Sequence, residues 1–145
     1  SDVCSSDLVA RMAMASQRAF DNAQSKQEHG KLPDTSTITA REALAWVTVE
    51  GARMLKMQDR IGTLTPGKQA DVVLIRATDL NMQPVHVAVT SIVTQTALSN
   101  IDTVLVAGQI KKSKGQLLAP DLGSLQQRLQ DSGHRIMRDL QALLH

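Results

Sequence analysis

The sequence predicts an α+β chain in which helices flank a middle segment rich in short strands. Two observations lead to this class. Apolar residues recur at helical spacing before residue 58 and after residue 118, and β-branched runs bounded by turn residues lie between these limits. We therefore divide the chain into helical residues 9–57, β-rich residues 58–118 and a helical tail over residues 119–145, and treat residues 1–8 separately.

The composition is that of a globular chain and excludes several functions. The 145 residues carry a formal net charge of +2, with one Phe, one Trp and no Tyr. A charge this small, without aromatic residues among the basic ones, gives no sign of nucleic-acid binding. No apolar run approaches the roughly 18 residues of a membrane-spanning helix, so no membrane partner is expected.

The first eight residues, SDVCSSDL, are expected to be foreign to the protein. They match the translated end of a widely used sequencing adapter, and segments of this kind are excluded from fold reasoning. Cys4, the only cysteine, falls within them and therefore indicates neither a redox compartment nor a thiol nucleophile. The alternative is an ordinary polar N-terminal tail.

The first predicted helix begins near Val9 and ends near Gln27, before the polar loop GKLPDTST. One face of this helix repeats at the i, i+3, i+4, i+7 spacing of an amphipathic helix. That stripe consists of Val9, Met12, Ala13, Ser16, Phe20 and Ala23.

A second helix is predicted to start at a capping box, in which the side chains of Thr39 and Glu42 each satisfy a backbone N–H. Apolar residues from Ala43 to Leu55 occupy more than one side, which is typical of a helix buried between layers. Gly51 costs roughly 1 kcal/mol relative to Ala in a helix interior, so we expect it to mark close packing or a break into a second short turn.

Residues 61–76, IGTLTPGKQADVVLIR, predict a β-hairpin. Two extended pieces flank a reversal at Pro66-Gly67, where Pro sets φ at the second position of a turn and Gly accepts the positive φ of a type II turn. After the turn, Val72–Ile75 is a β-branched run bounded by charge and predicts a buried strand.

The rest of the β-rich segment contains one ambiguous element and one clear hairpin. Val85 to Thr94 is apolar and β-branched, and its periodicity does not distinguish a strand from a short buried helix. Ile101 to Ala107 predicts a strand that turns at Gly108, returns to a KKSKG turn and closes with a short strand over residues 116–118. We expect three lysines to lie at a solvated hairpin tip, where they protect an edge, and not at an anion site: Lys111, Lys112 and Lys114.

Residues 119–145 predict a helical tail. Its apolar residues nearly follow a seven-residue pattern, which Ser132-Gly133 interrupts: Leu122, Leu125, Leu129, Ile136, Leu140 and Leu143. The pattern is too short for a coiled coil. We expect the stripe to pack on a parent domain or on a partner subunit.

Three blocks, in this order, resemble the C-terminal part of amidohydrolase-superfamily enzymes. ITAREALAWVTVEGARML is similar to the final barrel helices, IGTLTPGKQADVVLIR to the return into a small β-sandwich, and SNIDTVLVAGQIKKSKGQLL to the terminal hairpin. The resemblance covers about residues 37–118 and is closest to the branch of triazine hydrolases and of deaminases of cytosine, guanine and S-adenosylhomocysteine. Lys56 is a departure, because many relatives have a Gly that ends the helix there.

The resemblance implies a fragment with a composite fold. Residues 9–57 would be the last helices of a TIM-like barrel, residues 58–118 the C-terminal part of the β-sandwich and residues 119–145 the helical tail. The intact protein would be a metal-dependent hydrolase of deaminase or chlorohydrolase type, which cleaves C–N bonds of small cyclic substrates with a divalent ion, zinc or iron. The family's ligands are an H-x-H pair, later histidines and a strand-end Asp, and Asp7 cannot be that Asp if its codon is foreign.

The chain itself is therefore predicted to hold no catalytic, cofactor-binding or metal-binding residue. No two of its histidines are spaced to share a helix face: His29, His86, His134 and His145. His86 alone has apolar neighbours and is interpreted as a structural histidine. We expect the chain to be inactive, and to aggregate or dimerise because its helix stripes lack the N-terminal barrel that is their partner.

Two alternative identities of the chain remain open. The chain could be a complete small non-enzymatic β-rich binding or assembly module, which would show a closed core. Within the superfamily, it could come from a dihydropyrimidinase-like or deacetylase enzyme. We expect a cytoplasmic protein, although the absence of a signal peptide carries no weight when the native N-terminus is not visible.

Overall fold

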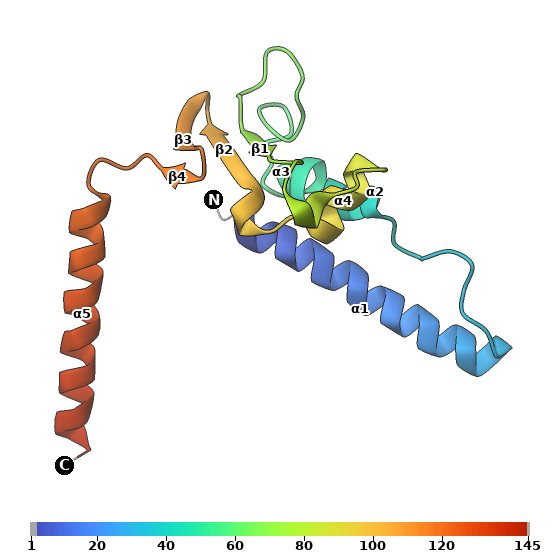
Figure 1. Ribbon diagram of the computed structural model, residues 1–145, viewed down its shortest axis with the longest axis horizontal. Coiled ribbons are helices and arrows are strands. Elements are labelled where there is room, and N and C mark those ends of the chain that lie inside the picture. The colour runs from blue at the N-terminus through green and yellow to red at the C-terminus, as the bar shows by residue number, and fades with distance from the viewer. Residues whose placement is uncertain (1–2, 145) are drawn as a thin grey trace.

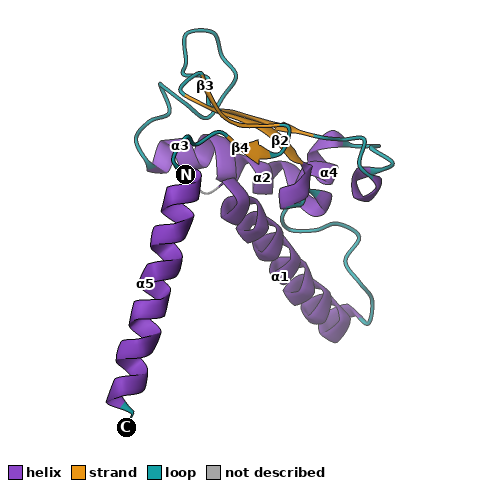
Figure 2. Cartoon of the chain, turned by 60° about the vertical axis from the view of Figure 1, so that its left-hand side comes forward, coloured by secondary structure: helices purple, strands orange, loops and turns teal. Residues whose placement is uncertain are grey.

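The computed structural model describes the backbone of residues 3–144 and the side chains of residues 9–144. A long helix and a group of short helices lie on one side of a small sheet, and a second long helix projects away from them (Figures 1 and 2). The side chains of Cys4 and Asp7 and the whole of His145 lie outside the described part. The α+β class is confirmed.

Helix α1 spans Val3–His29, so it starts earlier and ends two residues later than expected. The face that packs is not the predicted stripe. Ala10 and Met14 are 3% and 5% exposed, whereas Val9, Met12 and Phe20 are 63%, 59% and 64% exposed. The predicted stripe of α1 is therefore uncovered in the described part of the chain.

The second predicted helix is a helix with an interruption. Its parts are α2 (Ala40–Ala45), the π-helical turn η1 (Trp46–Glu50) and α3 (Gly51–Met54). Gly51 keeps helical dihedrals, and the helix changes there from the π-helical turn to α3. A Cβ on Gly51 would lie 3.1 Å from the carbonyl oxygen of Trp46, one turn earlier in the same helix, so the close approach at Gly51 is to its own backbone.

The capping box at the start of α2 is confirmed. The backbone N–H of Thr39 donates to Oε2 of Glu42 over 2.8 Å, and the N–H of Glu42 donates to Oγ1 of Thr39 over 3.2 Å. Because each side chain satisfies a donor that the helix leaves unpaired, the chain enters α2 at a defined residue.

The core joins α1 to α2 and to α4 (Ala88–Gln95), which settles the ambiguous segment as a helix. Its buried members come from all three helices: Ala10, Met14, Ala43 and Val93. Arg11 Nε donates to the carbonyl oxygen of Val93 over 2.9 Å, and Arg11 Nη2 donates to that of Thr96. The last carbonyls of a helix have no partner within it, so Arg11 ties α1 to the C-terminal end of α4.

The hairpin predicted over residues 61–76 is wrong in its first arm. Only β1 (Val72–Ile75) is a strand, and it pairs antiparallel with β2 (Ile101–Val106). The segment before β1 folds back on the loop that follows α3, where the N–H of Gln69 donates to the carbonyl of Arg60 over 2.8 Å. Hydrogen bonds with that loop therefore prevail over extended pairing.

The reversal inside that segment is confirmed. Gly67 has φ of +91°, and the N–H of Lys68 donates to the carbonyl of Thr65 over 3.1 Å, as in a type II turn with Pro66 at its second position. The ammonium group of Lys68 also donates to the carbonyl of Gln58. Lys68 thus attaches the turn to the loop that leaves α3.

The sheet has the order β1-β2-β3-β4, with β3 at Gln109–Ser113 and β4 at Gln116–Leu117. Both β2–β3 and β3–β4 turns have two residues with positive φ, at Ala107-Gly108 and Lys114-Gly115, as type I′ turns require. The predicted KKSKG turn is too long, because its first three residues belong to β3.

Helix α5 spans Leu122–Leu143 and continues through Ser132-Gly133 without a break. It stands apart from the sheet and from α1 in both views (Figures 1 and 2). Within residues 3–144, no helix combines the length and apolar character that crossing a bilayer requires.

Candidate functional site

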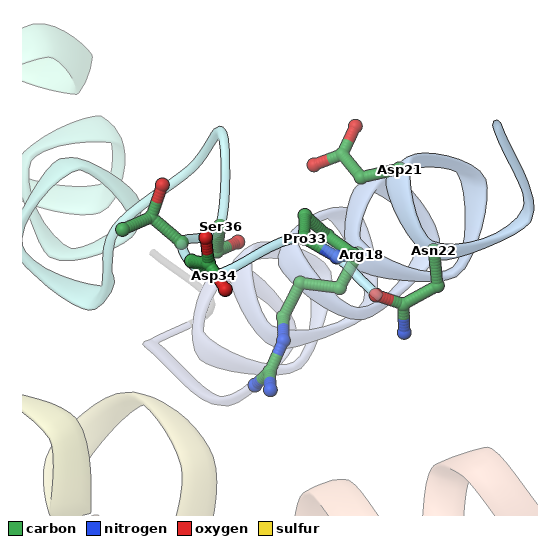
Figure 3. Close-up of a pocket in the computed structure, with 7 residues that line it drawn as sticks. Arg18, Asp21, Asn22, Pro33, Asp34 and Ser36 are labelled. Atoms are coloured by element: carbon green, nitrogen blue, oxygen red, sulfur yellow. The ribbon is translucent and has the colours of Figure 1, made fainter. Parts of the chain in front are cut away.

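A polar hollow of about 130 Å³ lies between the second half of α1 and the loop that follows it (Figure 3). It is open to solvent, and the labelled side chains do not converge on one point: the Arg18 guanidinium and the Asp21 carboxylate point to different sides. The lining includes Arg18, Asp21, Asn22, Pro33, Asp34 and Ser36.

Asp21 is the acidic group of the hollow with the best-defined partners. The N–H of Thr37 donates to its Oδ2 over 3.3 Å, and Gln17 Nε2 donates to its Oδ1 over 2.8 Å. Hydrogen bonds from Thr37, and then from Gln17, hold the pKa of Asp21 below its usual range. An ionised carboxylate with these donors ties the loop to α1 and is poorly suited to donate a proton near neutral pH.

A second polar cluster is buried where the chain enters β2. Asn100, 1% exposed, donates from Nδ2 to Oδ2 of Asp79 over 2.7 Å and to Oδ1 of Asn81 over 3.0 Å. Its own Oδ1 accepts from Asn81 Nδ2 over 2.9 Å and from the N–H of Ala97 over 2.8 Å. The side-chain amide of Asn100 makes all of these hydrogen bonds within the chain, so this cluster holds two segments together, residues 79–81 and residues 97–100.

Arg76 supplies the positive charge beside that cluster. Its guanidinium lies 3.7 Å from the carboxylate of Asp79 and 3.7 Å from that of Asp102. Sequence reasoning missed this network. The available signal was a polar run that interrupts the apolar pattern just before β2, but spacing alone does not show that two separate segments meet.

The structure keeps the singled-out basic residues apart. His29 lies at the end of α1, 3.8 Å from Glu28, and His134 lies on the exposed surface of α5. His86 is also exposed, so the apolar residues beside it in the sequence do not enclose it. His145 lies outside the described residues.

The three lysines do not form an anion site among the described residues. Lys111 Nζ donates to Oε1 of Gln109 over 2.7 Å, Lys112 is half-buried in β3, and Lys114 is exposed in the turn. Only Lys114 therefore lies at the hairpin tip expected for all three.

The described residues do not fit the divalent metal that the resemblance implies. Among residues 9–144, no three side chains of His, Cys, Asp or Glu come together as a metal ion would require. The carboxylates of Asp79 and Asp102 both pair with the guanidinium of Arg76 instead.

Comparisons with known proteins agree on one family. The profile of the Amidohydrolase family matches residues 3–111. A 5-methylthioadenosine/S-adenosylhomocysteine deaminase of Teredinibacter turnerae is 40% identical over 98 residues, which are 66% of this chain and 22% of that protein.

Several solved structures are similar to the chain. An adenosine deaminase of Xanthomonas campestris, with bound zinc, superposes with a TM-score of 0.73 at 26% identity, over 89% of this chain and 27% of that one. An atrazine chlorohydrolase of Arthrobacter aurescens TC1, complexed with zinc, has a TM-score of 0.65 over 82% and 24% of the chains. Its identity is 23%, so this likeness supports the fold alone. The chain spans about a quarter of the proteins it matches.

Proposed function

The chain belongs to the Amidohydrolase family, as its three sequence blocks indicated, and we propose that it is a structural C-terminal part of a metal-dependent hydrolase. Residues 9–57 complete a TIM-like barrel, residues 58–118 form part of the β-sandwich and residues 119–145 are the tail. The intact enzyme cleaves a C–N bond, or a related bond, of a small cyclic substrate. The deaminase relatives support the reaction, and the zinc of the related structures supports a divalent metal whose ligands lie outside this chain.

The observation that carries this proposal is that α1 is apolar on two separate faces. One face holds Ala10 and Met14, which are buried against α2 and α4. Another face holds Val9, Met12 and Phe20, each more than half exposed. A helix that is apolar on two faces is typical of a position between two layers. The second layer expected here is the strand wall of the barrel.

Further exposed apolar residues weigh against the rival proposal of a complete binding module. Leu55, Leu64 and Leu80 are 60%, 83% and 91% exposed. A self-contained module would cover most side chains of this size, since contiguous apolar patches on a monomer mark interaction surfaces. The scaffold proposal accounts for these residues as contacts with the rest of a larger enzyme.

The test compares this chain with a chimera in which residues 9–145 replace the corresponding part of the Teredinibacter deaminase. We expect the chimera to retain zinc and to deaminate adenosine analogues, because the graft supplies the same supporting layers. We expect the 145-residue chain alone to retain no zinc in dialysis and to show no turnover. Zinc content is measured by atomic absorption and turnover by the absorbance change of the purine.

Two substitutions in the chimera test the exposed apolar face of α1, which holds Val9, Met12 and Phe20. Met12→Asp should reduce the yield of folded, zinc-loaded chimera at least several-fold, since it places a charge in the expected barrel interface. Ala15→Asp is the matched control, because Ala15 is exposed and lies off both apolar faces of α1. Turnover by the isolated chain, or equal yields for both variants, would contradict the proposal.

A further inference from the structure

Residues 82–96, which contain α4, form a loop that starts and ends at one place. Met82 and Thr96, at its two ends, are 2% and 3% exposed, and Oγ1 of Thr96 donates to Sδ of Met82 over 3.9 Å. Beside this contact, Asn81 Nδ2 donates to the carbonyl oxygen of Gln95 over 2.9 Å. The two ends are therefore joined, and we call residues 82–96 the strap.

The base of the strap is attached to the sheet. Asn100, which shares hydrogen bonds with Asp79 and Asn81, directly precedes β2. The N–H of Arg76, directly after β1, donates to the carbonyl oxygen of Asn100 over 2.8 Å. These bonds connect the ends of two paired strands to the base of the strap. Buried, hydrogen-bonded groups of this kind belong to the part of a fold that opens last.

The middle of the strap contacts the helices through one side of α4. Val93 is 2% exposed and packs in the core with Ala10 and Met14 of α1, and Figure 1 shows α4 beside α2. The buried residues of α4 are Ser91 and Val93, both in its C-terminal half. Residues 85–88, at the other end of the segment, are exposed. The area that holds α4 against α1 is therefore small.

The sequence of α4 does not favour a helix by itself. Five of its eight residues are β-branched, and Val87 at its N-cap makes no side-chain hydrogen bond to the first turn. β-branched residues lower helix propensity, and helices shorter than about 12 residues are marginal in water without tertiary contacts. The segment is therefore helical because it packs on α1 and α2, and separation from them should unfold it.

Arg11 adds a polar contact between α1 and the strap. Its Nε donates to the carbonyl oxygen of Val93 over 2.9 Å, and its Nη2 donates to that of Thr96. Both carbonyls lie at the C-terminal end of α4, where a helix leaves acceptors without intrahelical partners and where its dipole favours a positive charge. One side chain on α1 thus satisfies two acceptors at the end of α4 that is packed.

We propose that the strap is a conformational device. Its helix separates from α1 and unfolds as a unit while its base stays bonded to the sheet, and Arg11 is the residue that holds it closed. In the closed state the strap connects the sheet to α1, and in the open state this connection is lost. The inference uses contacts within the chain and does not depend on the proposed function.

The first test measures amide hydrogen exchange in the 145-residue chain by NMR. The amides of Val93 and Gln95 in α4 should exchange faster than the amide of Arg76 at the base. Arg11→Gln should accelerate the two α4 amides about tenfold or more, since hydrogen bonds to a charged group are lost, and should leave the amide of Arg76 unchanged. Arg18→Gln is the matched control, because it makes the same charge change at an exposed position of α1.

The second test asks whether α4 unfolds when the strap opens. Thr90 is exposed in α4, so Thr90→Ala raises helix propensity without removing a buried contact. It should slow exchange at Val93 and Gln95 roughly two- to threefold, in the wild type and in the Arg11→Gln background alike. Thr35→Ala, the same change in an exposed loop, is the control and should have no effect on these amides.

Four results would overturn the proposal. Equal exchange at Val93 and Arg76 in the wild type would show that the strap opens only when the whole chain unfolds. Equal acceleration of both amides by Arg11→Gln would show that Arg11 supports the entire fold. Unchanged exchange at Val93 in Arg11→Gln would mean that Arg11 does not hold the strap closed, and unchanged exchange in Thr90→Ala would mean that α4 does not unfold on opening.

Discussion

Oδ1 of Asp71 accepts a hydrogen bond of 2.6 Å from the backbone N–H of Ala107. Asp71 directly precedes β1, and Ala107 is the first residue of the turn between β2 and β3. The N–H of Gly108 donates to the carbonyl of Ala70 over 3.0 Å beside this bond. Ala70 and Asp71, the two residues before β1, therefore hold the β2–β3 turn, which lies far along the sequence. This contact explains why a carboxylate precedes β1.

Asp71→Ala should loosen the β2–β3 turn. Loss of a hydrogen bond to a charged acceptor costs about 1 kcal/mol or somewhat more, and the N–H of Ala107 is left without that acceptor. We expect faster amide hydrogen exchange at Ala107 and at Gly108, measured by NMR. Asp59→Ala, at an exposed carboxylate away from the sheet, is the control. Unchanged exchange at Ala107 would show that the bond contributes nothing to the turn.

Gly62→Ala should be much more damaging than Gly67→Ala. Both glycines have φ near +90°, at +93° and +91°, so the backbone strain of adding a Cβ is matched. A Cβ on Gly62 would lie 2.7 Å from Cβ of Ala52, whereas one on Gly67 meets nothing within 4 Å. We expect a loss of about 1 kcal/mol at Gly67 and about 2 kcal/mol more at Gly62, measured by urea unfolding. Equal losses would contradict the close approach of this loop to α3.

Asn100→Ala should destabilise the entry to β2 more than Asn81→Ala does. Asn100 is 1% exposed, and its removal takes one hydrogen bond each from the partly buried carboxylate of Asp79 and from the N–H of Ala97, which costs about 2–3 kcal/mol. Asn81 is exposed, so water can replace its amide. The midpoints of urea unfolding, followed by circular dichroism, provide the comparison. A smaller effect at Asn100 would rule out its central place in the network.

The capping box should make stability depend on pH. The backbone N–H of Thr39, and then its hydroxyl, hold the pKa of Glu42 below its ordinary value of 4.5. The folded chain thus binds this proton more weakly than the unfolded chain does. The stabilisation is complete above about pH 4.5 and is lost as the pH falls through the folded pKa.

Glu42→Gln is the variant that isolates this effect. Its urea midpoint should lie below that of the wild type at neutral pH and converge with it in strong acid. Asp59→Asn serves as the control for a general change in charge. If the two curves for Glu42→Gln and the wild type stay parallel from neutral pH to strong acid, the carboxylate is not the source of the cap's stability.

The features that sequence reasoning predicted correctly are those that neighbouring residues decide. The Thr39–Glu42 capping box, the reversal at Pro66-Gly67 and the strand from Ile101 each depend on residues within a few positions. Their physical causes are a side chain that reaches its own backbone, a restricted φ and a run of β-branched residues. None of these needs a distant partner.

The first arm of the predicted hairpin failed for the opposite reason. Residues 61–71 have turn and extended propensities, but the N–H of Gln69 donates to Arg60 and the side chain of Lys68 donates to Gln58, both in the loop after α3. Likewise, apolar periodicity left the segment that became α4 undecided, and packing against Ala10 and Met14 made it a helix. Competition between partners far apart in sequence is invisible to a local pattern.

For the candidate site, the sequence by itself determined the family through three ordered blocks, and it indicated correctly that the relatives are hydrolases and deaminases. Only the tertiary structure decided which face of α1 is packed and which is bare, and that Asp79, Asn81 and Asn100 meet in one network. Helical periodicity shows that a face is apolar. Whether that face is covered depends on neighbours that the chain brings together only when it folds.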